Sequence, residues 1–148
     1  MEISAQIFLH LIIIFVAGLA VTYFIHQIIV IRETTTLYSV NYTAYKITES
    51  ILEVARKASA TKASTMLIVE LNMPYDFEIL NDFGNYKLRI KGFSIYTSGG
   101  SKITSLDFNL PRASMLRYEE SSGKCNVLRI LASYDSDNNL VLIKVSAG

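Results

Sequence analysis

The pattern of hydrophobic positions changes twice along the chain, and each part predicts a different element. Residues 7–31 are almost wholly apolar and lack the polar face of an ordinary surface helix. Across residues 37–58 apolar residues recur at alternating intervals of three and four, which is the period of an amphipathic helix. Beyond Met66 short apolar runs, some alternating with polar residues, are typical of β-strands. The sequence therefore predicts an α+β chain, with a helix first and a sheet second.

The apolar segment, residues 7–31, is long enough to cross a membrane. As a helix it would extend roughly 37 Å, which exceeds the hydrocarbon core of about 30 Å. No Lys or Arg precedes Arg32, so the segment lacks the basic leader of a cleavable secretory signal. We expect it to be a retained hydrophobic helix.

Two histidines, His10 and His26, interrupt the apolar segment. Ionisable groups in a bilayer can mark a proton relay or a gate. The two lie near opposite ends of the segment, and their separation places them on nearly opposite faces at about 100° per residue. A two-histidine metal site on this helix is therefore geometrically poor, and we expect the polar tips to reach the membrane interface.

The helix should continue past the membrane, because no Gly or Pro occurs between Leu19 and Met73. We expect one helix from about Ile3 to about Thr61, with three β-branched residues, 34–36, as a point for a bend or a melted turn. The apolar stripe can pack on the chain's own sheet or on copies of the same helix, and the first is favoured. We call these residues the amphipathic stripe: Leu37, Val40, Ala44, Ile47, Ile51, Val54 and Ala58.

The C-terminal part, residues 63–148, contains six to seven short apolar runs with turn residues between them. The first predicted strand begins at Met66 and ends at Pro74, because proline has no N–H for a central strand. Tyr86, Leu88 and Ile90 alternate with basic residues, which predicts a half-buried strand. Residues 126–134 and 140–145 flank a polar stretch and predict a hairpin. The pattern favours an antiparallel sandwich or a rolled sheet. The expected domains are thus residues 1–31, 32–62 and 63–148.

Composition excludes several functional classes. Of the 148 residues 51 % are apolar, and the net charge of +1 offers no basic field for nucleic acid. A single cysteine, Cys125, cannot form a disulfide framework, and we expect it to be a small buried side chain. The sequence contains no Gly-rich phosphate loop and no nucleophile elbow, and no histidine follows His26. We therefore expect no enzyme activity, no cofactor and no metal.

Two short motifs have a functional alternative. Asp135 and Asp137 resemble a calcium loop only in part, because the further ligands and the terminal Glu are absent. A solvated hairpin loop is the expected interpretation. Asn41-Tyr42-Thr43 is an N-glycosylation sequon, and it makes Asn41 a possible glycosylation site outside the cell.

This layout resembles the type IV pilin superfamily, and in particular archaeal pilin-like proteins. The stretch LNMPYDFEILNDFGNYKLRI is similar to a pattern of that family, in which a strand ends at a proline and a short segment precedes a Tyr-x-Leu-x-Ile strand. Here these positions are Pro74, Ile79, Tyr86, Leu88 and Ile90. The resemblance implies an immunoglobulin-like β-sandwich after the helix.

The resemblance also implies a role. The apolar helix would wait in the membrane and then join a bundle of identical helices in a cell-surface filament, with the β domain exposed for adhesion or a related task. The partners would be copies of the chain, the membrane before assembly, and an assembly machinery. The residues expected to carry membrane insertion and polymerisation are Ile7, Leu11, Ile14, Phe15, Gly18, Val21, Ile25 and Ile28.

Two other roles suit the same layout. One is a membrane-anchored accessory component, such as a minor pilin or an archaellum stator-like protein, that acts in few copies. The other is a single-pass anchor for a ligand-binding β domain. Abundance in a sheared surface fraction would separate both from a filament subunit.

Overall fold

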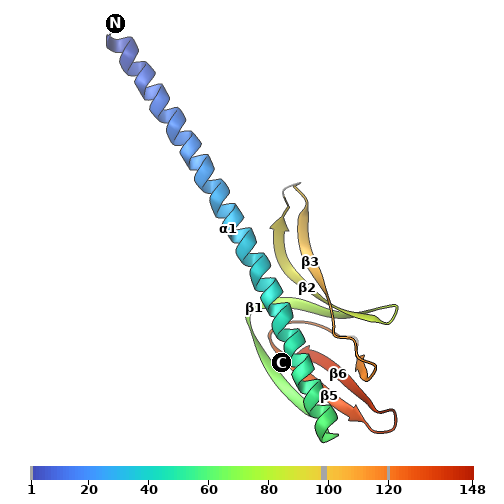
Figure 1. The fold of residues 1–148 in the computed structure, drawn as a ribbon. Helices are drawn as coiled ribbons and strands as arrows, with labels where there is room; N and C mark the ends of the chain where they lie inside the picture. The colour runs from blue at the N-terminus through green and yellow to red at the C-terminus, as the bar shows by residue number, and fades with distance from the viewer. Residues whose placement is uncertain (1, 98–99, 120) are drawn as a thin grey trace. The chain divides into compact units, whose positions relative to one another are not determined.

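The computed structural model describes residues 2–97, 100–119 and 121–148. They form one long helix, α1 (Glu2–Thr61), followed by a β-sheet, which confirms the predicted α+β class (Figure 1). The strands are β1 (Thr65–Asp82), β2 (Asn85–Tyr96), β3 (Lys102–Asn109), β4 (Leu116–Tyr118), β5 (Ser121–Asp135) and β6 (Leu140–Ala147).

Helix α1 contains 60 residues and shows no melted turn at its three consecutive threonines. The hydroxyls of Thr34, Thr35 and Thr36 donate to the carbonyl oxygens four residues earlier, at 2.6, 2.8 and 2.8 Å. These bonds satisfy the hydroxyls within the helix, which continues through its β-branched residues. The chain divides into two compact units, residues 1–36 and 37–148, so the last part of α1 belongs to the unit that contains the sheet.

The six strands form one sheet in the order β3-β2-β1-β5-β6-β4. All neighbouring pairs are antiparallel except β4 and β6, which are parallel. The parallel pair was not predicted. Strand β4 lies at the edge of the sheet opposite β3, so the chain crosses from one edge to the other between these two strands. The immunoglobulin-like sandwich is not confirmed, since the described strands belong to a single sheet.

The sheet is rolled, which was one of the two expected arrangements. Strands β2 and β4 are four steps apart in the strand order, or roughly 19 Å in a flat sheet with strands about 4.8 Å apart. Yet the rings of Tyr86 on β2 and Tyr118 on β4 have centroids only 5.0 Å apart. The two ends of the sheet therefore curl toward each other.

The prediction that the first strand ends at Pro74 is wrong, because β1 continues to Asp82. The register of β1 with β5 is interrupted between Glu70 and Tyr75, and its register with β2 begins at Asp76. Pro74 lies inside this irregularity, where the strand needs no ladder N–H from it. The proline thus marks a bulge in one long strand.

The core of the second unit lies between the last part of α1 and one face of the sheet. Six of the seven residues in the amphipathic stripe are buried, whereas Leu37 is 41 % exposed. Thr43 and Ala55, which lie off the predicted stripe, are also buried. The largest buried side chains from the strands are Ile79, Leu88, Ile90, Leu128, Ile130 and Ile143.

Two polar contacts also hold α1 on β1. Ser39 shares a hydrogen bond of 2.9 Å with the hydroxyl of Tyr75, and Lys46 Nζ donates to the carbonyl oxygen of Glu70 at 2.6 Å. The favoured prediction was that the stripe packs on the chain's own sheet. The structure agrees, because the buried stripe residues belong to the same core as the buried strand residues.

Charged side chains form cross-strand ion pairs on β1, β2 and β3. Arg89 Nε and Nη2 donate to the two carboxylate oxygens of Asp107 at 2.6 and 2.8 Å, and Lys91 pairs with Glu78 at 2.6 Å. The Arg89 guanidinium holds the pKa of the Asp107 carboxyl below its ordinary value, mainly through this hydrogen bond.

We expect Asp107→Asn to lower the free energy of unfolding slightly near neutral pH, by no more than an exposed ion pair contributes. The folded pKa of Asp107 is depressed, so its contribution is present above the ordinary aspartate pKa and is lost as the pH falls through the folded value. Denaturant unfolding of both proteins across the acid range should give stabilities that converge at low pH. A constant difference at all pH values would contradict this assignment.

Tyr118 fixes the segment between β3 and β4. Its phenol donates a hydrogen bond of 2.9 Å to the carbonyl oxygen of Pro111, and burial raises the pKa of the phenol. The group therefore remains a protonated donor through the whole neutral and mildly alkaline range.

We expect Tyr118→Phe to reduce the free energy of unfolding by about 1 kcal/mol, because one intramolecular hydrogen bond is lost and the half-buried carbonyl of Pro111 loses its donor. Hydrogen exchange measured by mass spectrometry should show faster exchange in residues 110–116. Tyr134→Phe is a suitable control, because the hydroxyl of Tyr134 bonds only to the exposed hairpin residue Asn139. Equal effects of both variants would argue against the structural role of the Tyr118 bond.

Candidate functional site: the uncovered apolar surface of α1

Every large hydrophobic residue of the apolar segment is exposed, with fractions from 42 to 68 %. Burying one such side chain is worth about 1.5–3 kcal/mol, so a surface of this size cannot persist in water. The expected membrane and polymerisation residues all lie on it: Ile7, Leu11, Ile14, Phe15, Gly18, Val21, Ile25 and Ile28. At about 100° per residue these eight lie on one side of the helix. Other exposed apolar residues, such as Phe8, Ile12 and Ile13, cover the remaining sides, so the segment has no polar face and is suited to lipid or protein on every side.

Two polar side chains of the segment, those of His10 and Thr22, have hydrogen-bond partners within the helix. His10 Nδ1 lies 2.7 Å from the carbonyl oxygen of Gln6, and Thr22 donates to the carbonyl oxygen of Gly18 at 2.9 Å. Such bonds within the helix reduce the cost of placing polar groups in lipid. Residues 3–31 contain no Asp, Glu, Lys or Arg.

By length and composition α1 is able to cross a membrane. None of the residues in its most apolar part is buried, whereas the core helix of a soluble protein is mostly buried. The helix is thus suited to be a membrane anchor or a signal.

Gly18 forms a small notch in this surface. In the described chain a side chain added there would meet nothing within 4 Å. Small residues let the backbones of two helices approach closely, which is how helices associate in an apolar medium. Gly18 is therefore a point where a second helix can pack tightly.

A row of tyrosines follows the apolar segment on α1 and was not singled out in the sequence. Tyr38, Tyr42 and Tyr45 are exposed, and the rings of the first two stack with centroids 6.5 Å apart. The sequence could have shown this row, because a spacing of four and three residues places all three tyrosines on one face of a helix, away from the amphipathic stripe. Tyrosine is enriched at membrane interfaces, so this row is suited to the boundary between lipid and water.

The remaining candidate residues give no catalytic arrangement. Asn41 is exposed, while the third residue of its sequon, Thr43, is buried. Cys125 is only partly buried, and not buried as expected, but desolvation still raises the pKa of its thiol, which disfavours the reactive thiolate. Among the described residues no three His, Cys, Asp or Glu side chains are grouped closely enough to hold a metal ion.

Asp135 is occupied by its own hairpin loop. Its carboxylate accepts hydrogen bonds from the backbone N–H of Asp137 at 3.0 Å and from the side-chain amide of Asn138 at 2.8 Å. These bonds lower the pKa of Asp135. The loop joins β5 and β6, as the predicted hairpin requires, and the Asp135 carboxylate stabilises its turn.

Comparison with known proteins gives no match: no protein-family model, no curated protein and no solved structure is similar to this chain at a significant level.

Proposed function

We propose that this chain is a structural subunit of a type IV pilus-like surface filament, which polymerises through the apolar segment of α1. One observation carries the proposal: an exposed apolar segment continues, in the same helix, into the core of a folded β domain. The helix thus presents one part to an apolar environment and contributes the other part to its own domain. The role is non-catalytic.

The energetics favour a helix that moves between two apolar environments. Lipid tails are as apolar as leucine side chains, so transfer from the membrane into a helix bundle leaves the hydrophobic term nearly unchanged. Packing at small residues such as Gly18 then decides the balance between the two states. Repetition of one heterologous contact would extend the assembly into a helical filament.

The β domain would form the outer surface of such a filament. In this domain the last part of α1 is already packed on the sheet, with six of the seven stripe residues buried. The amphipathic stripe is therefore not free to pack on another copy. An immunoglobulin-like sandwich, cell adhesion, glycosylation at Asn41 and an assembly machinery as partner remain part of the proposal by resemblance to the pilin superfamily.

The experiment that tests the proposal is to shear surface appendages from the native cells and image them by cryo-electron microscopy. Mass spectrometry of the same fraction would identify this chain and its N-terminus. A filament dominated by this chain, with a core of parallel apolar helices, is the expected result.

The alternative is a membrane-anchored accessory protein, and the exposed apolar segment suits that role as well. In that case the chain would stay in the membrane fraction, and the sheared filaments would lack it. That outcome would overturn the filament proposal and direct the search for partners to the β domain.

A further inference from the structure

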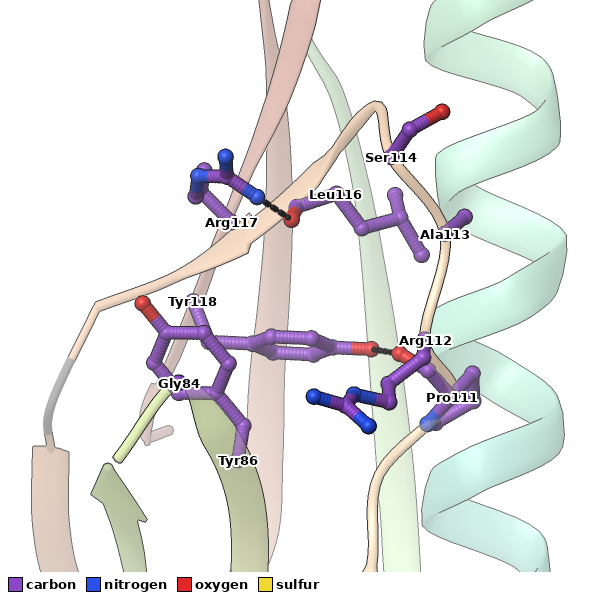
Figure 2. Close-up of a pocket in the computed structure, with 9 residues that line it drawn as sticks. All are labelled: Gly84, Tyr86, Pro111, Arg112, Ala113, Ser114, Leu116, Arg117 and Tyr118. Carbon is purple, nitrogen blue, oxygen red and sulfur yellow. Dashed lines mark hydrogen bonds between the residues drawn. The ribbon is translucent and has the colours of Figure 1, made fainter. Parts of the chain in front are cut away.

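A pocket of about 280 Å³ lies where the beginning of β2 meets the segment that leads into β4 (Figure 2). It exists because the sheet is rolled, which brings β2 close to β4. No part of it belongs to the apolar segment of α1. The described residues that line it are Gly84, Tyr86, Pro111, Arg112, Ala113, Ser114, Leu116, Arg117 and Tyr118.

The charged groups among these lining residues are two arginines. Arg112 is exposed, and its guanidinium extends from the segment beside the Tyr118 ring (Figure 2). Arg117 Nη1 donates to the carbonyl oxygen of Leu116 at 3.1 Å, which leaves its other N–H groups available. A guanidinium presents a planar fork of donors that matches a carboxylate.

A second hollow of about 270 Å³ adjoins the first and shares Tyr86 and Arg112 with it. Its lining includes the carboxylate of Asp82, but Lys87 Nζ binds this carboxylate at 2.6 Å. The Asp82 charge is therefore compensated locally and does not neutralise Arg112. The two hollows together form a site that favours an anion.

Two aromatic rings give the site an apolar wall. Tyr86 and Tyr118 pack with centroids 5.0 Å apart and planes inclined at 46°. Tyr118 is held by its hydrogen bond to Pro111, so it supports Tyr86 from behind and restricts the position of that ring. An aromatic face next to a guanidinium can bind a ligand that has one apolar face and one negative group.

We propose that this pocket binds a carboxylated sugar residue of an acidic polysaccharide. The carboxylate would accept hydrogen bonds from Arg112, and the C–H face of the sugar ring would lie on Tyr86. A volume near the lower end of the range for ligand pockets suits one sugar unit, and the open adjoining hollow leaves room for the chain to continue. A bare phosphate would use the arginines but leave the aromatic wall unoccupied.

The test uses the full chain in micelles of an uncharged detergent that has no sugar headgroup. Glucuronate, glucose and inorganic phosphate are titrated separately, and binding is measured by calorimetry and by NMR shifts. Arg112→Gln removes the proposed carboxylate ligand. Arg129→Gln is the matched control, because Arg129 is an exposed arginine on β5 outside the pocket.

We expect glucuronate to bind more tightly than either glucose or phosphate. Loss of a charge-assisted hydrogen bond should raise the Kd for glucuronate roughly 10-fold or more in Arg112→Gln. The Kd should be unchanged in Arg129→Gln, and the spectra of both variants should show an intact β domain.

Three results would overturn the inference. They are no glucuronate binding by the folded chain, equal affinity for phosphate and glucuronate, and equal weakening by both arginine variants. The measurement is made on chains dispersed in micelles, so it does not depend on filament assembly. Failure of this test would leave the proposed filament role untouched. Failure of the filament experiment would likewise leave the proposed sugar site untouched.

Discussion

Ile14→Asp is expected to abolish filament assembly. Ile14 is 68 % exposed and lies within the apolar segment of α1, so every assembled copy would place a carboxylate in an apolar core. A charged group at the centre of a transmembrane helix costs about 2.5–3.5 kcal/mol even on insertion scales that allow relaxation. In a helical polymer this cost would recur at every subunit. Electron microscopy of the sheared surface fraction should show no filaments of this chain.

Ile14→Leu is the matched control for this substitution, because it keeps both the volume and the apolar character of the side chain. Its filaments should be normal in number and length. The amount of each variant in the membrane fraction separates a defect in assembly from a failure of insertion. The β domain should remain folded in both, since Ile14 belongs to the other compact unit. Normal filaments from Ile14→Asp would refute polymerisation through this segment.

Ile51→Ala is expected to destabilise the β domain strongly. Ile51 is completely buried between α1 and the sheet, where it belongs to the core with Ile130 and Ile143. Removing its side-chain atoms loses the free energy of burying them and leaves a cavity. Together these two effects cost about 2–5 kcal/mol. Because small domains have a free energy of unfolding of about 5–15 kcal/mol, this is a large share of the total. Denaturant unfolding in micelles, followed by hydrogen exchange of β5 amides, measures the loss.

Leu37→Ala provides the comparison within the same stripe. The sequence assigns Leu37 and Ile51 to one periodic row, but Leu37 is 41 % exposed at the beginning of the second unit. Its truncation should therefore cost less than about 1 kcal/mol, as is usual for surface positions. Equal destabilisation by the two substitutions would contradict this, because it would mean that Leu37 is buried like the rest of the stripe.

The long helix could be predicted from the sequence because its signals are local. The absence of Gly and Pro between Leu19 and Met73 and the period of the stripe are enough to extend it to Thr61. The hairpin of β5 and β6 was equally local. The continuation of β1 through Pro74 was not, because a proline is tolerated only where neighbouring strands leave its position unpaired.

The sequence by itself determined that the chain has a helix with an apolar segment and an amphipathic stripe, followed by strands. These properties depend on the order of polar and apolar residues over a few turns. Only the tertiary structure decided that the strands form one rolled sheet, that β4 pairs with β6 in parallel, and that Tyr86, Arg112 and Tyr118 line one pocket. Strand order and curvature depend on contacts between residues far apart in the chain, and hydrophobic period does not encode which distant strand a given strand will meet.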